Sequence, residues 1–280
     1  MIESAPIVSI GIPLYNGADF ISETILSVLG QTFQHWELII TDDGSLDGSD
    51  KIAKSFTRDP RVRFFSNPEK LGVEGNWNRC VSEGRGLYRK LLCHDDRLHP
   101  ECLEKQVAIF TKPENKSVAL VSAAKTIITP NGRQLFSRRW KVRSQMIHRS
   151  RAVRQIVRSG TNPIGEPGAV LFRAEDWHSI GGFCARLPYV IDLDFWLKLL
   201  RIGDCYYLSE PLFDFRVSAQ SWSHKLTNAQ SFQYSSLIEQ LAGKGNVSLS
   251  RLDYIIGRIR SPLNALLRQL IYYWWCHDHK

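Results

Sequence analysis

The sequence predicts an α/β fold in which a mostly parallel sheet is flanked by helices and followed by a helical C-terminal extension. Short apolar runs rich in β-branched residues alternate with segments of helical periodicity over residues 6–121, the pattern of repeated strand–helix–strand units. Further on, apolar residues recur at helical spacing over residues 251–276. We therefore expect two parts, residues 1–220 with the sheet and residues 221–280 with the helical extension.

The first half of the chain supplies the alternating elements in order. The first strand is expected at residues 7–12, which are rich in Ile and Val and precede Pro13. Later strands are expected at residues 36–41, 62–65, 87–92 and 118–121. Helices are expected at residues 19–29, 47–56, 72–83 and 100–110, with Ser45 or Asp47 as an N-cap. Parallel strands need such crossover helices, so the order of elements predicts a parallel sheet.

The second half of the chain is first basic and then helical. Residues 115–165 contain no Asp or Glu but many Lys and Arg, with a turn expected at residues 129–132. The later elements are expected to be a strand at residues 169–173 and helices at residues 191–200 and 221–243. In the segment 251–276, Pro262 predicts a break or kink, and interspersed Arg and Gln residues make it too polar to span a bilayer.

Composition limits the partners and the compartment. The chain has 280 residues and a net charge of +8, from 36 basic and 28 acidic residues, which favours anionic partners such as nucleotides, nucleic acid or acidic lipid. Its six cysteines form no Cys-x-x-Cys pair, so a zinc site is not expected. The N-terminus lacks a basic segment before an apolar one, so we expect no secretory signal and a cytoplasmic protein with reduced cysteines.

Chemically useful side chains gather where three expected strands end. The clusters are Pro13-Leu14-Tyr15-Asn16, Asp42-Asp43-Gly44-Ser45 and Cys93-His94-Asp95-Asp96. Ligands of doubly wound sheets bind at the carboxyl ends of the strands. Because the clusters are rich in carboxylates, they suit a metal-bound phosphate compound better than a bare anion. A nicotinamide dehydrogenase is disfavoured, because no Gly-x-Gly-x-x-Gly follows the first strand.

Further motifs follow along the chain. They are Ser27-Val28-Leu29-x-Gln31-Thr32-Phe33, Asn67 with Gly72, Gly181-Gly182-Phe183 and Asp192-x-Asp194-Phe195-Trp196-Leu197. Over about residues 6–216, the order and spacing of all these motifs resemble the family 2 glycosyltransferases, which have the nucleotide-sugar-binding fold called GT-A. The resemblance implies an inverting, metal-dependent enzyme that moves a sugar from a nucleotide-diphospho-sugar, with UDP as the expected nucleotide. The acceptor it implies is a carbohydrate or lipid-linked saccharide, in surface polysaccharide biosynthesis.

The resemblance also assigns the residues that bind the donor. Asp43 is expected to accept the ring N–H of uracil, with Pro13 and Tyr15 lining the base pocket. Asp96 is expected to contact Mg²⁺ or Mn²⁺, with Asp95 as a second ligand nearer the ribose or sugar. A cation there neutralises the diphosphate as it departs. The other donor-binding residues implied are Asn16, Asn67 and Arg216.

The same resemblance places the catalytic base at Asp192, which takes the proton from the acceptor hydroxyl as its oxygen attacks the anomeric carbon. Two residues apart on a helix, Asp192 and Asp194 do not face the same way, so only one can be central. Three positions depart from the family pattern. Cys93 and Ile191 stand where acids are usual, and Ser218 stands where a histidine is usual, with His224 six residues on.

The residues also allow other interpretations. The acidic clusters can also be ordinary strand-to-helix turns and helix caps. Because Cys93 and Ile191 stand at positions where acids are usual, a catalytically weak nucleotide- or partner-binding protein is one alternative. The basic residues 133–158 have three interpretations: a solvated helix face, a contact for an anionic acceptor or membrane, or a surface that binds nucleic acid. Nucleic-acid binding is disfavoured, because no known binding module is recognised. The segment 251–276 either covers the sheet or lies in a membrane interface with its arginines at the headgroups. Trp222 either stacks on a sugar ring or packs within the core or on the surface of the protein.

Overall fold

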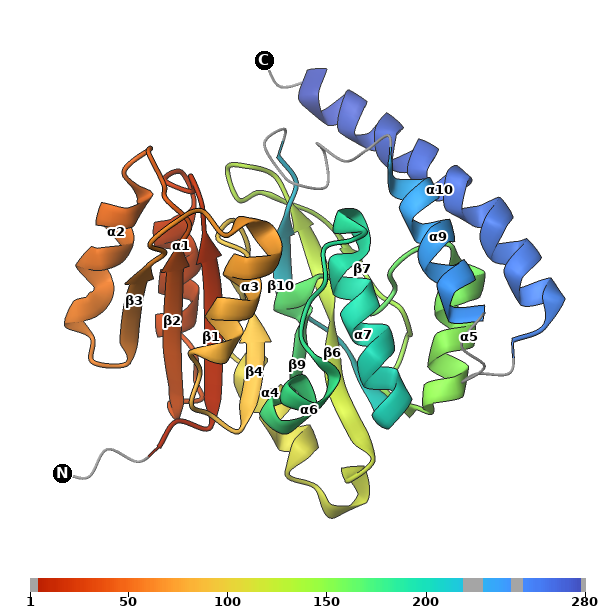
Figure 1. The fold of residues 1–280 in the computed structure, drawn as a ribbon, viewed down its shortest axis with the longest axis horizontal. Coiled ribbons are helices and arrows are strands. Elements are labelled where there is room, and N and C mark those ends of the chain that lie inside the picture. The colour runs from red at the N-terminus through yellow and green to blue at the C-terminus, as the bar shows by residue number, and fades with distance from the viewer. Residues whose placement is uncertain (1–4, 219–228, 243–248, 278–280) are drawn as a thin grey trace.

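The centre of the molecule is one ten-stranded sheet (Figure 1). The computed structural model describes residues 5–218, 229–242 and 249–277. The strands are β1 (Val8–Leu14), β2 (Trp36–Asp42), β3 (Val62–Ser66), β4 (Tyr88–Leu91), β5 (Arg97–Leu98), β6 (Val118–Ile128), β7 (Gln134–Arg138), β8 (Gln145–Ile147), β9 (Val170–Arg173) and β10 (Asp204–Arg216). Their order in the sheet is β3-β2-β1-β4-β9-β6-β10-β5, with β7 paired to β6 and β8 to β10.

The parallel pairs are the long ones and contain most of the paired residues, and the antiparallel pairs are short. β3, β2, β1 and β4 pair in parallel, as do β6 and β10, whereas β9 lies antiparallel between β4 and β6. Leu14 lies opposite Asp42, and Asp42 lies opposite Ser66, so β1, β2 and β3 end at the same edge. The prediction of a mostly parallel α/β sheet is confirmed, and this edge carries the polar clusters after β1 and β2.

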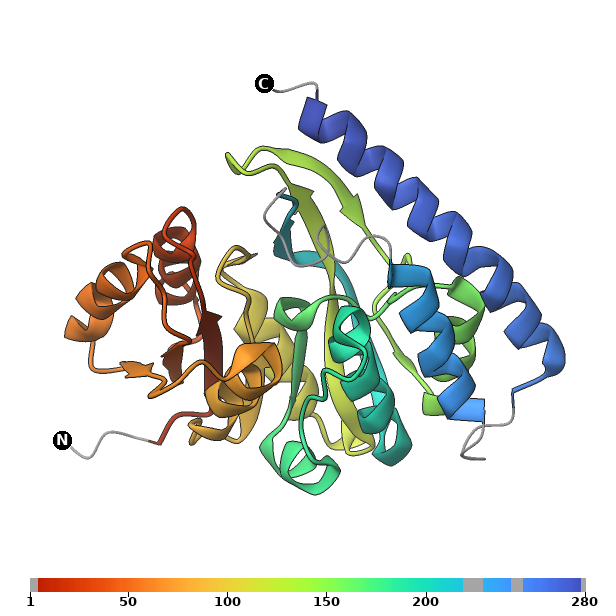
Figure 2. The ribbon, with the colours of Figure 1, turned by 45° about the horizontal axis from the view of Figure 1, so that its top comes forward.

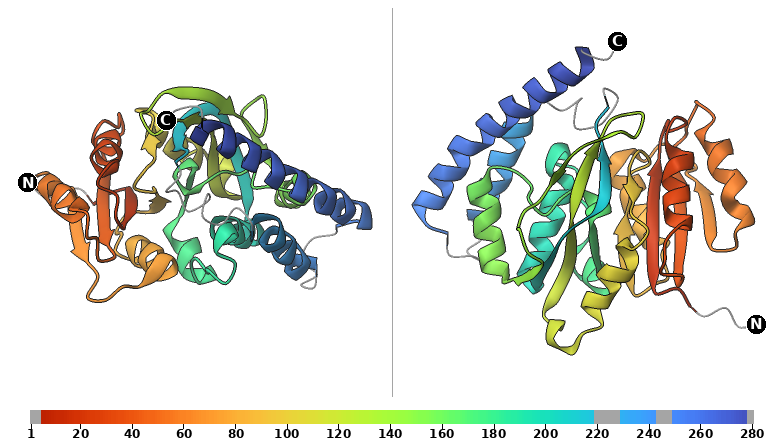
Figure 3. Two further views of the ribbon diagram at one scale, coloured as in Figure 1. Left: turned by 90° about the horizontal axis from the view of Figure 1, so that it is seen from above. Right: turned by 180° about the vertical axis from the view of Figure 1, so that it is seen from behind.

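Helices cover both faces of the sheet. They are α1 (Ile21–Leu29), α2 (Ser49–Ser55), α3 (Gly72–Ser82), α4 (Cys102–Phe110), α5 (Arg149–Ser159), α6 (Ala174–Ile180), α7 (Ile191–Ile202), α9 (Gln230–Ala242) and α10 (Arg251–His277). In Figure 1, α3, α6 and α7 lie in front of the sheet, and α1 and α4 lie behind it, as the rear view in Figure 3 also shows. Residues of β1, β2 and β6 are buried throughout, which explains why their sequences are largely apolar.

The C-terminal helices stand at one end of the sheet, where α10 packs along α5 and α9 (Figure 2). Small residues allow this close approach. A Cβ atom added to Gly257 would lie 2.3 Å from the carbonyl oxygen of Val157 on α5. Ser261 and Ala265 are buried on the following turns of α10. After the buried Asp253, the buried row of α10 is therefore made of small residues at intervals of four.

Six large apolar side chains of α10 point away from the rest of the fold. This α10 apolar stripe consists of Leu252, Ile255, Ile259, Leu263, Leu266 and Leu267, each 53–60% exposed. The expectation that the apolar face covers the sheet does not describe these side chains, because α10 contacts α5 and α9 through its other face. Within the described part of the chain, we find no helix that combines the length and apolar character needed to cross a bilayer.

The basic stretch forms several elements rather than one helix. β7 and β8 come first, and α5 follows, with Arg151, Arg154 and Arg158 exposed on one side and its apolar residues buried. The expected solvated helix face thus describes α5. β6 continues to Ile128, well beyond the predicted end, because β10 and then β7 pair with its second half. α10 runs through Pro262 without ending, and α9 is the described part of the helix expected at residues 221–243.

Candidate active site

The loops after β1 and β2 are tied to each other. The side-chain oxygen of Asn16 accepts a hydrogen bond from the Leu46 N–H at 2.9 Å, and the Asn16 N–H donates to the Ser45 hydroxyl at 2.9 Å. Asn16 has a φ of 49°, a left-handed conformation that Asn tolerates better than most residues. The two polar clusters predicted at these strand ends therefore form one connected edge.

Asp43 organises the next loop. One of its oxygens accepts hydrogen bonds from the Asn67 amide and the Leu71 N–H, both at 2.7 Å, and the other accepts the Gly72 N–H at 2.9 Å. The structure thus brings Asp43, Asn67 and Gly72 together, as the sequence motifs suggested. The ring of Tyr15 is 39% exposed and has the Lys70 ammonium 3.9 Å from its centroid.

The Cys93–Asp96 turn follows β4 at the same edge. The Thr24 hydroxyl of α1 lies 2.8 Å from the carbonyl oxygens of both His94 and Asp96 and so fixes the turn from below. One ligand atom each from Cys93, Asp95 and Asp96 lies within 4.8 Å of the others. Burial raises the pKa of the Cys93 thiol well above its usual value, and hard cations such as Mg²⁺ prefer carboxylate oxygens to sulfur, so the two carboxylates are the better metal ligands.

Asp96 has an unusual environment for an acid. Its Oδ1 accepts the Arg216 N–H at 2.9 Å, but its Oδ2 is buried with no hydrogen-bond partner among the described residues. Burial and the neighbouring Asp95 raise the pKa of Asp96 well above the usual range. A buried carboxylate oxygen without a partner is destabilising, and a divalent cation would supply the missing partner. The residues present therefore fit Mg²⁺ or Mn²⁺.

Arg216 holds the acidic turn against the end of β10. Its side chain is fully buried and donates to the carbonyl oxygens of Asp95 at 2.7 Å and Pro130 at 2.6 Å, and it pairs with Glu23 at 2.5 Å. These contacts position the acidic turn, and the expected contact of Arg216 with the donor stays a prediction. Ser218 is buried. His224 and Trp222 lie outside the described residues.

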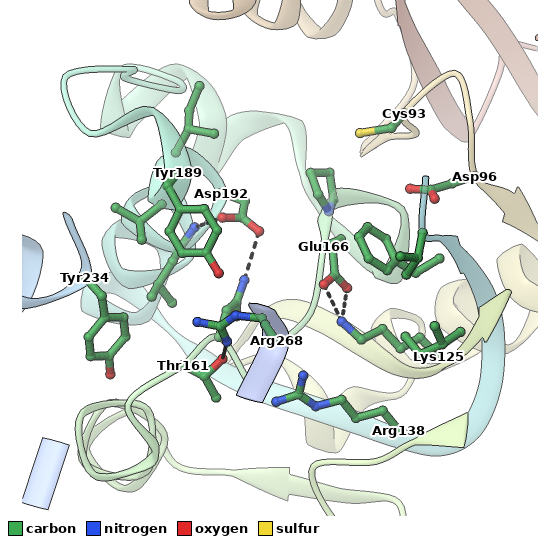
Figure 4. Close-up of a pocket in the computed structure, with 18 of the residues that line it drawn as sticks. Cys93, Asp96, Lys125, Arg138, Thr161, Glu166, Tyr189, Asp192, Tyr234 and Arg268 are labelled. Atoms are coloured by element: carbon green, nitrogen blue, oxygen red, sulfur yellow. Dashed lines mark hydrogen bonds and ion pairs between the residues drawn. The ribbon is translucent and has the colours of Figure 1, made fainter. Parts of the chain in front are cut away.

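A cavity of about 240 Å³ separates this turn from the first turn of α7 (Figure 4). Cys93, Asp95 and Asp96 line one side, and Asp192 lines the other. Its apolar and aromatic lining includes Trp77, Phe136, Pro188, Tyr189, Phe215 and Tyr234. A polar cavity end with an aromatic wall is suited to a sugar, whose hydroxyls need hydrogen bonds and whose ring faces pack on aromatic groups.

Asp192 is held and tuned by its neighbours. Its Oδ2 accepts the Asn162 amide at 2.9 Å, and its Oδ1 accepts the Leu193 N–H at 2.7 Å. Burial, followed by the charge of Glu166, raises the pKa of Asp192 to about 7. Asp194 instead pairs with Lys198 at 2.9 Å along the helix. The two aspartates face different surroundings, as their spacing on a helix predicts.

Some cavity residues were not found from the sequence. Lys125 of β6 forms an ion pair with both oxygens of Glu166 inside the cavity. Glu166 had a signal that could have been used, since it is the first acid after the acid-free residues 115–165. Arg268 of α10 also lines the cavity and donates to the Thr161 hydroxyl at 3.2 Å. No local pattern marks Arg268, because it arrives by packing of a distant helix.

The sequence of this chain is similar to those of known proteins. The family described as Glycosyl transferase family 2 matches this chain over residues 9–177. The chain belongs to glycosyl transferase family 2. Among curated relatives, a chondroitin synthase of Pasteurella multocida is 28% identical over 261 residues, which is 90% of this chain and 25% of that enzyme. The chain spans 25–41% of the length of several such relatives.

Solved structures of the same fold agree with the family assignment. TarS of Staphylococcus aureus in complex with UDP-GlcNAc has a TM-score of 0.70, with 16% identity over 93% of this chain and 72% of that one. A mannosyltransferase of Pyrobaculum calidifontis in complex with GDP-Man and Mn²⁺ has a TM-score of 0.63, with 16% identity over 96% of this chain and 76% of that one. At this identity they establish the GT-A fold of the chain and no more.

Proposed function

We propose that this family 2 chain moves a sugar from a nucleotide-diphospho-sugar, with UDP as the expected nucleotide, to a carbohydrate or lipid-linked saccharide, with inversion. The observation that carries the proposal is the position of Asp95 and Asp96 across one cavity from Asp192. A single displacement needs charge stabilisation at the leaving group and a base at the attacking group. The two sides of the cavity offer these two functions.

The nucleotide is proposed to lie at the ends of β1 and β2, beside the cavity. The carboxylate of Asp43 fixes the loop around Asn67 and would face the ring N–H of uracil. The partly exposed ring of Tyr15 offers a stacking surface for the base. Asn16 joins the two loops on which this pocket depends, and Pro13 is buried in β1 just before it.

Asp96 and Asp95 are proposed to hold Mg²⁺ or Mn²⁺ at the inner end of the donor site. When bound, the ion neutralises the diphosphate and eases its departure. The unpartnered Oδ2 of Asp96 supports this role, because both ions prefer carboxylate oxygens. Arg216 keeps the turn in place through the Asp95 carbonyl and the Asp96 carboxylate.

Asp192 is proposed to be the catalytic base. The acceptor hydroxyl gives its proton to the Asp192 carboxylate while its oxygen bonds to the anomeric carbon. The bond from that carbon to the diphosphate oxygen breaks on the opposite face, so one displacement inverts the configuration. General-base assistance of this kind contributes about 10²–10⁴-fold to the rate.

We propose that the protein is cytoplasmic and reaches its acceptor at an anionic membrane surface. Its proposed role is in surface polysaccharide biosynthesis. The α10 apolar stripe lies beside the exposed Arg251, Arg258 and Arg260, a combination typical of helices that lie in a membrane interface. Arg268 of the same helix lines the cavity, so a lipid-linked acceptor would lie close to the reacting groups. The match to a chondroitin synthase supports a polysaccharide product.

The decisive experiment is thermal stabilisation by UDP, GDP, dTDP and CDP, each with and without Mn²⁺. A ligand at a hundred times its Kd stabilises the fold by about 2.7 kcal/mol. We expect a metal-dependent shift with one nucleotide, UDP, and its loss in Asp96→Asn. Asp19→Asn, at an exposed acid, is the matched control and should keep the shift. A wild-type protein that responds to none of the four nucleotides would refute the proposal and favour a partner-binding role.

A further inference from the structure

The loop of residues 162–166 is hydrogen-bonded to the proposed base, Asp192. The Asn162 amide donates to the Asp192 Oδ2 at 2.9 Å and to the Gly165 carbonyl at 3.0 Å. The indole N–H of Trp196, on the same helix as Asp192, donates to the same Gly165 carbonyl at 3.1 Å. Gly165 has a φ of 112°, which a residue with a side chain rarely adopts. The loop is therefore fixed to the first turns of α7, and Glu166 comes directly after it.

Glu166 is held as a charged group inside the cavity. Both of its oxygens pair with the Lys125 ammonium, whose side chain is 8% exposed. Burial alone would raise the pKa of Glu166, but Lys125 outweighs it, and the pKa lies below the usual value. Figure 4 shows the pair on the cavity floor between the acidic turn and Asp192. A fixed carboxylate thus lies in the same enclosed space as the proposed base.

Other charged groups also face this space. Asp95, Asp96 and Cys93 lie across the cavity, and Arg138 of β7 and Arg268 of α10 line its wall. Two tyrosines complete the titratable set, Tyr189 and Tyr234. Among the charges acting on Asp192, that of Glu166 is the largest and opposes the smaller effect of Lys125. A like charge favours the protonated form of a neighbouring acid.

We propose that Glu166 is the positioning residue that makes Asp192 a strong enough base to take the acceptor proton near neutral pH, with Lys125 keeping Glu166 ionised and Asn162 holding Asp192 in place. The inference rests on the proposed transfer reaction. During that reaction the proton moves from the acceptor oxygen to the Asp192 carboxylate, and the negative charge of Glu166 stabilises the protonated product. Glu166 itself gains and loses no proton.

The titration of Asp192 can be measured without turnover. Protein labelled with ¹³C at Asp carboxyl carbons is titrated by NMR, and Asp192→Asn identifies the resonance. We expect a midpoint of about 7 in the wild type and a midpoint lower by about one unit or more in Glu166→Gln. Glu166→Asp keeps the charge and should restore the higher midpoint. Glu210→Gln removes an exposed, Lys-paired acid and should leave it unchanged.

Activity supplies the second readout. With the donor found by the nucleotide panel, the acid limb of the pH profile of kcat/KM should move down with the NMR midpoint in Glu166→Gln. A midpoint and limb that stay in place in a folded variant would overturn the inference, as would an equal loss of rate at every pH. If Glu166→Gln does not fold, the double variant Lys125→Met with Glu166→Gln removes both charges of the ion pair. An Asp192 midpoint in this double variant at or above the wild-type value would overturn the inference. If the wild type transfers no sugar but Glu166→Gln still lowers the Asp192 midpoint, the proposed transfer reaction is refuted and the effect of Glu166 on Asp192 is not.

Discussion

Asp96 illustrates how a single buried acid can lower the stability of the fold. Its pKa is raised by burial and Asp95, whereas an unfolded Asp loses its proton near pH 4. Above that pH the unfolded chain binds fewer protons than the folded one, so rising pH favours unfolding. We expect metal-free Asp96→Asn to be more stable than the wild type at pH 8, with a Tm higher by about 2–4 °C for each kcal/mol gained.

Thermal unfolding in EDTA at pH 4 and pH 8 measures this effect. The advantage of Asp96→Asn should be largest at pH 8 and should shrink towards pH 4, where the carboxyl is protonated in the folded state and about half protonated in the unfolded state. Asp19→Asn, on the surface, should show no such dependence. A variant that is less stable than the wild type at pH 8 would mean that Asp96 is already paired without a metal.

The residues foreseen from the sequence share a simple property. Asp43, Asp96 and Asp192 all stand at the end of a strand or the start of a helix, where local sequence alone indicates a polar site. Glu166 and Arg268 reach the cavity that Asp96 and Asp192 line through loop closure and helix packing, which no local pattern encodes. Ile191 illustrates the difference, since it stands where an acid is usual in the sequence pattern while Glu166 brings an acid into the same cavity.

At the scale of elements, the contact between α10 and α5 depends on Gly257. A Cβ atom there would lie 2.3 Å from the backbone oxygen of Val157, and backbone cannot move aside as a flexible side chain can. We expect Gly257→Ala to lower the free energy of unfolding by about 1–3 kcal/mol, the usual effect of overpacking. Helix propensity alone predicts the opposite sign, because Ala favours helix over Gly by about 1 kcal/mol.

Thermal unfolding and limited proteolysis distinguish these two effects. Gly257→Ala should unfold at a lower temperature and be cut earlier within α10. Arg258→Ala, one position on and exposed, should behave like the wild type. Greater stability in Gly257→Ala would show that the helices separate easily and that their contact contributes little.

The elements themselves were largely foreseen, and the exceptions have physical causes. Periodicity located α1, α3, β2 and β3 within a few residues, because each has one buried face or is buried throughout. β6 was expected to be much shorter, since its second half depends on strands that come later in the chain. The apolar period of α10 gave its extent correctly, but periodicity does not state whether an apolar face is covered by protein.

At the scale of the whole molecule, the α10 apolar stripe and the surrounding arginines predict binding to anionic vesicles. Burying a leucine side chain contributes about 1.5–3 kcal/mol, so Leu263→Gln with Leu267→Gln should weaken binding at least about tenfold. Leu26→Gln with Leu46→Gln, at exposed leucines elsewhere, is the matched control. Flotation with vesicles containing phosphatidylglycerol is the measurement.

Two outcomes would exclude the membrane surface. Equal flotation of both double variants would show that the stripe is not the contact. Failure of the wild type to bind vesicles, together with self-association that only Leu263→Gln with Leu267→Gln abolishes, would assign the stripe to a second copy of the chain.

The cavity wall formed by Tyr234 and Arg268 has a consequence for synthesis on the ribosome. A nascent chain exposes the acidic turn and Asp192 well before α9 and α10 have left the exit tunnel. Until these last helices dock, the cavity lacks one wall and stays open to water, where a nucleotide sugar would be prone to wasteful hydrolysis. Because α9 and α10 complete the cavity wall, the site cannot become active until translation has passed Arg268.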